Sequence, residues 1–463
     1  MAKLDSELPA KSERVAAFIA GFDLREAPAE LIDAAETAFI DTIGVMLAGS
    51  CEPAAKIICD MIAAEGAGPT ALIVGRPLRT SAQNAALANG TATQALDFDL
   101  SFMSGQSAAA VIPALLPLAE TTQASAKDLI AAFIVGCEIA ARVVRSFPTL
   151  SSEGGWHGAG IVGAIAAAAA CAKLTQAPTG SLPPILGIAA SMASGLGANF
   201  GTMTKPLHPG TAARNGMMAA FLGTSGFTAS DTAIEGPQGF LALYARGLEW
   251  DPAPFDDLGE TFNLLDPGYK IKPFSCGGLL HTAIEAALHL RQAAQPRLDQ
   301  IDKIVIGATP HAVRRVIDKY PWSEDSSRFS LKYLIPHALI HGAPTLATFS
   351  EQALEDDAVR ALSERVTALV DDEFTGGNGI GYSPSRVTIT FTNGDRLEKT
   401  LIHPSGSKKP PMSDPTIKAK FYDCASRAVS ESTASELYGY LRNFRDHENL
   451  GGLWPLLTSD DES

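Results

Sequence analysis

Apolar residues recur at three- and four-residue spacing through most of the first 265 positions of this 463-residue chain. That spacing places them on one face of an α-helix. It predicts helices over residues 13–22, 29–48, 82–96, 108–120, 126–144, 158–174, 212–222 and 239–246. In this part of the sequence only residues 71–74 have the pattern of a strand. The first 265 residues are therefore predicted to form a helical domain.

The pattern changes after Asp266, where an Asp-Pro-Gly turn begins. Further on, two apolar runs alternate on either side of Asn393-Gly394, a dipeptide typical of a β-hairpin turn. The elements predicted in this section are helices at 279–291, 331–340 and 357–369 and strands at 303–308, 386–391 and 397–402. Such a mixture predicts a small α+β domain.

Helical spacing returns near the end of the chain, at residues 414–428 and 432–445. A chain of this length also exceeds the usual size of one domain. We therefore predict a mainly α fold, in which residues 1–265 and 405–463 together build a large all-helical domain. The α+β section, residues 266–404, is predicted to be inserted as a smaller lid domain.

The composition narrows the class of protein. The formal net charge is −15, which argues against nucleic acid or an anionic membrane as a partner. Apolar stretches such as 161–171 are too short to cross a bilayer, and the first residues lack the apolar run of a signal peptide. The six cysteines form no CxxC pair, as expected of reduced thiols in a cytoplasmic protein. An anionic ligand would have to be attracted by local positive groups.

The segment 199–216 has the most informative residue types in the chain. It brings Lys205, His208 and Arg214 together with several glycines, prolines and threonines. Lys205 and His208 each precede a proline, which favours an extended backbone. Thr211 is then predicted to cap a helix, whose first N–H groups attract an anion. The pattern fits a site that binds and deprotonates a small polycarboxylate; the alternative is a solvated loop before a surface helix.

Two other clusters have acid or base chemistry. Asp97 and Asp99 alternate with apolar residues, so in an extended chain both carboxylates lie on one face. The alternative is an acidic pair on a surface loop. His157 precedes a very apolar helix, whose dipole disfavours the charged imidazole and keeps a neutral base available. It can equally be an ordinary helix cap.

The segment 268–281 lies where the α+β section begins. Lys272 precedes a proline, as Lys205 does, and Ser275 and Cys276 lie near a predicted helix start. Cys276 with His281 would suggest a thiolate nucleophile, but no third group that orients the pair is evident.

Other familiar motifs are excluded by their context. Residues 158–163 match G-x-G-x-x-G, but no strand precedes them and no acidic residue lies near position 183 to bind a ribose. Those glycines are interpreted as helix-packing residues. His337 and His341 have the i, i+4 spacing of metal ligands but are interpreted as helix-surface or dimer-contact residues. No metal site is predicted.

These clusters, in this order, resemble the MmgE/PrpD family, which includes 2-methylcitrate dehydratases, cis-aconitate decarboxylases and iminodisuccinate epimerases. The resemblance spans about residues 10–430, and the block 199–216 is its most specific part. The matching residues are 95–99, 113–116 with Glu120, 156–157, 199–216, 272–276, 328–331, 410–413 and 420–421.

The resemblance implies a large helical domain built from both chain ends, a smaller α+β lid, and a homodimer that needs no metal. It implies a site between the domains. The implied catalytic residues are Asp97, His157, Lys205, His208 and Lys272. The side chains expected to bind the substrate are Arg214, Ser101, Gln106, Ser275 and Cys276. His157 is the first choice as the acid/base and His208 the second.

The chain departs from the family at one wall of the implied site. The family commonly has His-Ala-Leu-Asp-Phe-Asp-Asp-Thr-His, followed a few residues on by His-Pro. The residues that replace members of this pattern are Gln94 for the first His, Leu100 for the second Asp of the pair, Ser101 for Thr, Phe102 for the next His, and Gln106 for the His of His-Pro. Several titratable groups are therefore missing.

Three functions remain open at this stage. The first is a lyase, a dehydratase or decarboxylase of a tricarboxylate such as 2-methylcitrate or aconitate, in which cations stabilise an enolate-like state without an organic cofactor. The second is an epimerase of a dicarboxylate such as iminodisuccinate, since the missing histidines favour a less demanding leaving group. The third is a ligand-binding homologue without turnover.

Overall fold

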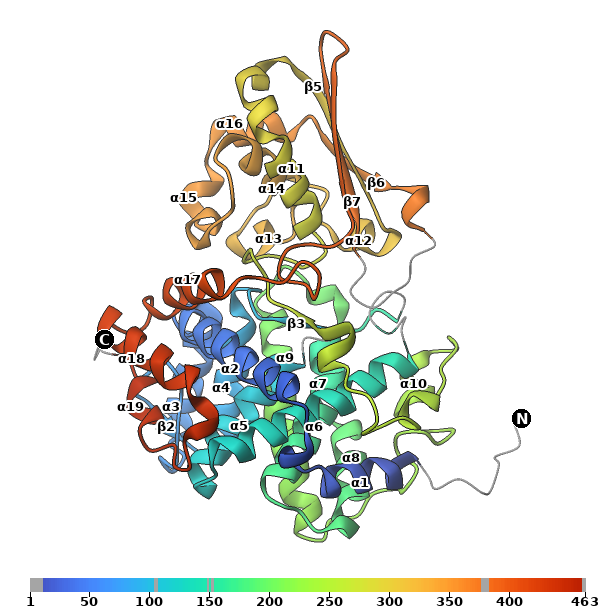
Figure 1. Cartoon of the computed structure of the whole chain (residues 1–463), viewed down its shortest axis with the longest axis vertical. Coiled ribbons are helices and arrows are strands. Elements are labelled where there is room, and N and C mark those ends of the chain that lie inside the picture. Colours follow the sequence, from blue (N-terminus) through green and yellow to red (C-terminus); the bar gives the residue numbers. More distant parts are fainter. Residues whose placement is uncertain (1–10, 104–106, 148–149, 151–153, 376–382, 460–463) are drawn as a thin grey trace.

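The helices and strands form two units, one above the other in Figure 1. The computed structural model describes residues 11–103, 107–147, 150, 154–375 and 383–459. The lower, larger unit is helical, and the upper unit contains a four-stranded sheet. Red helices from the end of the chain lie on the lower unit, beside blue helices from its beginning. The prediction of a mainly α fold is confirmed.

The larger unit contains most of the helices predicted from apolar spacing. Two further helices, α3 and α8, were not predicted. Its helices from the first part of the chain are α1 Lys11–Gly21, α2 Ala29–Ser50, α3 Pro53–Glu65, α4 Ala82–Ala95, α5 Ala108–Thr122, α6 Ala126–Ser146, α7 Gly158–Leu174, α8 Leu182–Ser191, α9 Thr204–Thr224 and α10 Phe240–Ala245.

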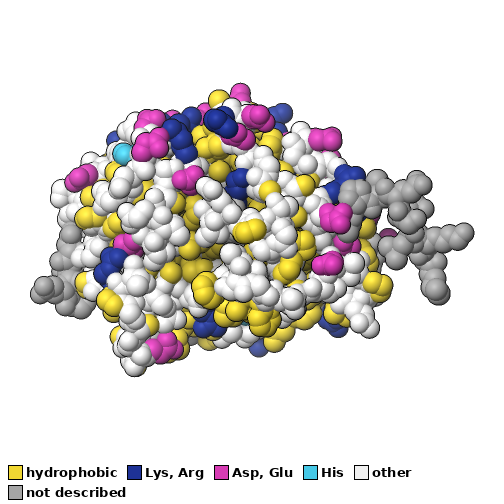
Figure 2. Space-filling view, turned by 90° about the horizontal axis from the view of Figure 1, so that it is seen from below, with side chains coloured by type: hydrophobic (Ala, Val, Ile, Leu, Met, Phe, Trp, Pro, Cys, Tyr) yellow, Lys and Arg dark blue, Asp and Glu magenta, His cyan; other side chains and the backbone are white. Residues whose placement is uncertain are grey.

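The outer face of this unit is partly apolar. Figure 2 shows hydrophobic side chains spread across the lower face of the molecule. In the part of the chain that the structure describes, no helix is both long and apolar enough to cross a membrane.

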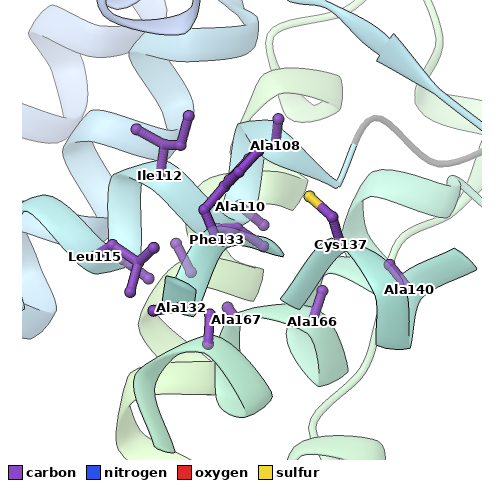
Figure 3. Close-up of a cluster of buried hydrophobic side chains, with 14 of the residues drawn as sticks. Ala108, Ala110, Ile112, Leu115, Ala132, Phe133, Cys137, Ala140, Ala166 and Ala167 are labelled. Carbon is purple, nitrogen blue, oxygen red and sulfur yellow. The ribbon is translucent and has the colours of Figure 1, made fainter. Parts of the chain in front are cut away.

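Helix α7 forms the centre of the larger unit. Its residues are buried from Gly158 to Ala172, which fits a helix that is apolar on all sides. It packs against α5, α6 and α9. Figure 3 shows Ala166 and Ala167 of α7 facing Phe133 and its neighbours on α5 and α6. Small residues let these backbones approach closely, which explains the high alanine and glycine content.

The crossing of α4 and α9 depends on two glycines. A Cβ atom at Gly90 would lie 2.6 Å from the Cα of Gly210, and one at Gly210 would lie 2.4 Å from the carbonyl oxygen of Leu87. Neither position has room for a side chain. This crossing sets the distance between the end of α4 and the beginning of α9.

The smaller unit packs helices against a sheet of strand order β6-β5-β7-β8. Strands β5 and β6 are parallel, and the other pairs are antiparallel. The predicted hairpin around Asn393-Gly394 is confirmed as β7 and β8. The elements are α11 His281–Ala294, β5 Ile301–Ala308, α12 Pro310–Arg315, α13 Glu324–Ser327, α14 Leu331–Ile340, α15 Glu351–Leu354, α16 Asp357–Ser363, β6 Val366–Val370, β7 Ser385–Phe391 and β8 Arg396–Leu401.

The predicted helix over residues 357–369 is wrong in its second half. The helix ends at Ser363, and strand β6 occupies Val366–Val370. The β-branched residues of this run suit a strand, and pairing with β5 satisfies their backbone groups. The tertiary pairing therefore overrides the helical spacing.

Two short antiparallel pairs lie outside the main sheet. The predicted strand at 71–74 is present as β1 Ala71–Leu72, paired with β2 Arg79–Thr80. Strand β3 Ser101–Phe102 pairs with β4 Tyr269–Lys270, so the chain entering the smaller unit contacts the segment after α4.

The last helices return to the larger unit, as predicted. They are α17 Asp414–Ala425, α18 Glu431–Arg442 and α19 Leu453–Leu456. Helices α17 and α18 pack against α2, and Phe421 of α17 is buried in the same core. A Cβ atom at Gly44 of α2 would lie 2.9 Å from the Phe421 ring. The exact domain limits at residues 265 and 404 stay a prediction.

Candidate active site

The chain turns sharply after α4, and Asp97 lies in that turn. Its φ is 48°, in the left-handed region that Asp tolerates better than most residues. Its N–H donates to the carbonyl of Gln94 at 3.1 Å. Asp97 is therefore not extended, because the backbone folds back at the end of the helix, and the alternative of an acidic pair on a surface loop is wrong because both carboxylates are buried.

Two lysines from distant segments bind the Asp97 carboxylate. The ammonium groups of Lys205 and Lys272 donate to the same oxygen, Oδ1, at 3.0 Å and 2.7 Å. All three side chains are buried. The two cations, together with the hydrogen bonds that they donate, outweigh the cost of burial and hold the pKa of Asp97 well below its usual range. The same carboxylate raises the pKa of Lys272, although burial opposes this.

Asp99 lies beside this cluster without a hydrogen-bond partner. Its carboxylate is 3.9 Å from the ammonium of Lys272, and in the described structure neither of its buried oxygens accepts a hydrogen bond. Burial, with a contribution from the neighbouring Asp97 and Asp41 carboxylates, raises the pKa of Asp99 to about 6. It therefore takes up a proton at a higher pH than an ordinary carboxyl group does.

The turn itself is fixed by three basic side chains. The carbonyl oxygens of residues 96, 97 and 98 each accept a hydrogen bond from a different cationic residue. The donors, in that order, are Arg328 at 3.2 Å, Lys272 at 2.8 Å and Lys420 at 2.9 Å. They come from the smaller unit, from the segment before it and from α17. Hydrogen bonds from charged donors are stronger than neutral ones, so this turn is held firmly.

The Lys420 contact depends on a buried acid that sequence reasoning missed. Asp41 of α2 forms an ion pair with Lys420 at 2.7 Å, and Lys420 also lies over the Phe98 ring at 4.0 Å. The sequence signal for Asp41 was that it is the one charged residue in the apolar second half of α2, because a buried charge requires a partner of opposite charge. Lys420 and Arg328 were noted only as parts of the family resemblance.

Helix α9 begins eight residues earlier than predicted, at Thr204 instead of at residue 212. Lys205 and His208 are therefore helical and not extended, and Thr211 is not a cap. Pro206 is tolerated because first-turn N–H groups have no partner within the helix. The Lys205 ammonium lies 5.6 Å from the Phe200 ring and 5.5 Å from the Phe329 ring, which confines it.

His157 and His208 form a directly bonded pair. His157 is the residue before α7, as predicted, and its Nδ1 lies 2.9 Å from Nδ1 of His208. Burial and the Lys205 cation lower the pKa of His157 well below its usual value and that of His208 to about 4. Both rings are therefore neutral at pH 7, as expected for His157. The main cause of the lowered pKa is desolvation, whereas the sequence had suggested the helix dipole.

The bond between the two Nδ1 atoms determines which nitrogen of each ring carries the proton. One ring donates from Nδ1 and the other accepts, so the two must have different tautomers. When His157 is the donor, its Nε2 has a free lone pair. This Nε2 is buried and has no hydrogen-bond partner in the described structure. His157 therefore has one nitrogen held by His208 and the other available for a ligand.

A narrow cavity opens next to Asp97 and Lys205. Its lining includes Asp97 and Lys205 from the larger unit and Asp325, Arg328 and Phe329 from the smaller one. Its volume is ≈ 10 Å³, about the room of one water molecule. The two units close over the buried charges in this structure.

The other predicted site residues lie in different places. Ser275 donates to the Leu96 carbonyl at 2.6 Å and accepts from Arg328 at 2.5 Å, so it supports the turn. Burial and the Asp97 carboxylate raise the pKa of the Cys276 thiol. His281 Nε2 bonds to the backbone oxygen of Cys276 at 3.2 Å. The structure therefore does not form the thiolate–imidazole pair.

Arg214 is not brought into the cluster. It follows Lys205 by nine residues, about two and a half helical turns, which places it on the opposite face of α9. Ser101 lies in β3, opposite Lys270 of β4. Gln106 lies outside the described residues. The structure thus gathers Asp97, Lys205 and Lys272, with the two histidines near Lys205.

Comparison with known proteins identifies the family of this chain. The pattern of the MmgE/PrpD N-terminal domain matches residues 13–253, and that of the MmgE/PrpD C-terminal domain matches residues 274–443. The chain belongs to the MmgE/PrpD family. The matched C-terminal domain includes α17 and α18, which pack on the larger unit.

Curated members of the MmgE/PrpD family include enzymes similar to this chain over most of its length. It is 28% identical to the cis-aconitate decarboxylase of Homo sapiens over 96% of this chain and 94% of that protein. It is 27% identical to the cis-aconitate decarboxylase of Aspergillus terreus (strain NIH 2624 / FGSC A1156) over 93% and 91%. A 2-methylcitrate dehydratase of Escherichia coli (strain K12) is 30% identical over 26% of each chain.

Proposed function

We propose that this member of the MmgE/PrpD family is a lyase that removes water or CO₂ from a small tricarboxylate such as 2-methylcitrate or aconitate. The observation that carries the proposal is the buried cluster of Asp97, Lys205 and Lys272 beside the His157–His208 pair. Full-length similarity to cis-aconitate decarboxylases supports the substrate class.

The lysines suit the charge that develops in such a reaction. Breaking a bond beside a carboxylate leaves electrons in an enolate-like state, which nearby cations stabilise. Lys205 and Lys272 are held at fixed positions by Asp97. Because their side chains are buried, their interaction with an anion is only weakly screened by solvent.

His157 is proposed as the proton acceptor and donor. Its Nε2 has no partner in the described chain, and Nδ1 is fixed by His208. Lys205 contributes to the low pKa of His157. Substrate carboxylates would offset that positive charge, so His157 becomes more basic when the substrate is bound. In dehydration His157 takes the α proton, the C–O bond breaks, and the protonated His157 returns that proton to the leaving hydroxide, which departs as water. In decarboxylation the C–C bond to one carboxylate breaks, CO₂ leaves, and the carbon that carried it takes a proton from His157, which regains one from water.

An epimerase of a dicarboxylate such as iminodisuccinate is the second candidate. The observation in its favour is the replacement of family histidines by Gln94, Phe102 and Gln106. An epimerase moves a proton at one carbon and needs no acid for a leaving hydroxide. The same cluster would then bind two carboxylates. A ligand-binding homologue without turnover is the third candidate.

One experiment separates these functions. The protein is incubated in deuterated water with 2-methylcitrate, citrate, cis-aconitate, trans-aconitate or iminodisuccinate, and the products are followed by NMR and mass spectrometry. Loss of water or CO₂ supports the lyase. Deuterium uptake without a change of composition supports the epimerase and overturns the lyase. Tight binding without any change indicates the third function. His289→Ala, which changes an exposed histidine of α11, serves as the control for His157→Ala.

We also propose that the protein is a cytoplasmic homodimer. In each subunit, residues 266–404 are proposed to form the lid. Exposed apolar side chains such as Phe221 and Phe227 are consistent with a covered surface in the assembly. Sedimentation at micromolar concentration tests the dimer, and a monomer there would contradict it.

A further inference from the structure

A carboxylate of the smaller unit borders the charged cluster of the larger one. Asp325 lies in α13, at the lower edge of the upper unit in Figure 1, and it lines the narrow cavity together with Asp97 and Lys205. Burial raises the pKa of Asp325, whereas the nearby Arg328 and Lys205 cations favour its ionised form. Two carboxylates, one from each unit, thus border the same small space.

The two carboxylates differ in their partners. Asp97 accepts hydrogen bonds from two buried lysines. Asp325 is half-buried, and among the residues that the structure describes none donates a hydrogen bond to its carboxylate or forms an ion pair with it. The Arg328 guanidinium, three residues further on, donates to the Leu96 carbonyl and to Ser275 instead. The oxygens of Asp325 therefore stay available as acceptors.

The turn that bears Asp325 is fixed by its neighbours. The hydroxyl groups of Ser323 and Ser326 each accept the backbone N–H of the other residue, a reciprocal cap that closes the turn. The preceding acid, Glu324, accepts the backbone N–H of Glu351 at 3.1 Å and so ties α13 to α15. Asp325 is thus held in the smaller unit without the use of its own carboxylate.

The chemistry of the cavity limits the group that Asp325 can bind. The cavity holds about one water molecule, so a six-carbon acid enters only when the units separate, with Asp325 on one and Lys205 on the other. The lysine attracts a substrate carboxylate, whereas Asp325 repels one. An ionised carboxyl group only accepts hydrogen bonds, so it requires a donor on the otherwise anionic ligand. In a small tricarboxylate that donor is a hydroxyl group.

We propose that Asp325 accepts a hydrogen bond from the hydroxyl group of the substrate and so selects hydroxy-tricarboxylates, such as citrate or 2-methylcitrate, over tricarboxylates without a hydroxyl. This inference rests on the proposed function and narrows it to the removal of water, since aconitate has no hydroxyl group to lose. Asp325 takes no proton in this role. It orients the C–O bond that breaks.

The test compares two probes that differ in one group. Citrate and tricarballylate are both tricarboxylates, and only citrate has a hydroxyl. Calorimetry measures the affinity of each for the unchanged protein, for Asp325→Ala and for Asp325→Asn. The control is Asp357→Ala, which changes an exposed aspartate in the first turn of α16.

Two checks accompany the titrations. Melting curves verify that each variant is folded, and Asp325→Asn carries the test if Asp325→Ala is unstable. NMR verifies that citrate is not consumed during the titration. If citrate is consumed, the whole series is repeated in the His157→Ala protein.

The readout is the ratio of the two affinities, because removing a negative charge strengthens the binding of both anions alike. Asp325→Ala is expected to lower the preference for citrate over tricarballylate by at least about tenfold, since a hydrogen bond to a charged acceptor is lost. Asp325→Asn keeps an amide acceptor and is expected to lower the preference by a smaller factor. Asp357→Ala is expected to change the ratio by less than about twofold.

Two results would overturn the inference in different ways. If Asp325→Ala and Asp325→Asn have the same ratio as the unchanged protein, while Lys205→Ala loses affinity for both acids, Asp325 does not recognise the hydroxyl and the proposed function stands. If the unchanged protein binds neither acid, the proposed function falls and the inference with it.

Discussion

The ammonium of Lys272 donates to both the side chain and the backbone of Asp97, at 2.7 Å from Oδ1 and 2.8 Å from the carbonyl oxygen. One cation therefore fixes the left-handed backbone and the carboxylate orientation of the same residue. Asp97 can then serve as the counter-ion that holds Lys205 and Lys272 together.

Asp97→Asn should destabilise the protein strongly. The change leaves Lys272, which is fully buried, without its main counter-ion, and breaking a buried pair costs about 3–5 kcal/mol. Lys205→Ala leaves Asp97 bonded to Lys272, so it should cost less. Thermal melting of the two variants tests the order, and an equal or smaller loss for Asp97→Asn would contradict this account.

Lys205→Ala should lower turnover at least about tenfold while the protein stays folded. The reason is the loss of one of the two cations that we propose stabilise the reacting carboxylates. Steady-state kinetics and far-UV circular dichroism provide the measurement, with Lys303→Ala as an exposed control. Full activity of Lys205→Ala on the true substrate would show that this lysine is structural.

His157→Ala should remove turnover more completely than Lys205→Ala and leave substrate binding measurable. An acid/base group contributes to the chemical step more than to affinity. Calorimetry with the substrate separates the two effects, and the control His289→Ala should behave as the unchanged protein. Loss of binding together with turnover would reassign His157 as an anchor.

The buried histidines should make stability depend on pH between about 4 and 6.5. The folded pKa of His208 is about 4, below its ordinary value, so in this window the unfolded chain binds more protons. The free energy of unfolding therefore falls as the pH is lowered through the window. His208→Gln removes this contribution, so the advantage of the unchanged protein over the variant should shrink towards pH 4. Denaturation at several pH values measures it, and a constant difference would refute the burial argument.

Lys420→Met should lower both the melting temperature and the turnover number. It leaves Asp41 buried without a cation and removes the donor to the Phe98 carbonyl. Lys420→Arg, which keeps the charge, should recover part of both losses. Lys418→Met, two residues earlier and exposed, is the matched control. A folded Lys420→Met protein with normal kinetics would show that this contact does not position the turn.

The spacing of apolar residues predicted a helix correctly where the apolar positions that it marks are the ones that pack in the core. Helix α7 has the predicted bounds because it is apolar on all sides and lies in the core. The start of α9 was mispredicted because a residue before proline favours an extended chain in general, whereas the first turn of a helix accepts proline. Strand β6 was missed because its partner, β5, is more than fifty residues earlier in the chain.

The residue types of the site were predictable, but their pairings were not. Lys205, Lys272 and Asp97 each lie in a segment with unusual polar content, and the structure brings them together. The roles of Arg328 and Lys420 depend on backbone carbonyls more than 230 and 320 positions away. Contacts between residues so far apart in the chain cannot be recognised from a local sequence pattern. Ser275 was expected to bind substrate, but its hydroxyl is bonded within the turn.

The backbone contact between Gly90 and Gly210 acts as a spacer for the charged cluster. Helix α4 leads directly into Asp97, and the first turn of α9 bears Lys205. Their 3.0 Å ion pair therefore depends on how closely two glycines let the helices cross. A larger residue at either glycine would force acid and base apart without touching them. The distance between the Asp97 carboxylate and the Lys205 ammonium is thus set by the helical frame, at a place well away from the charged groups themselves.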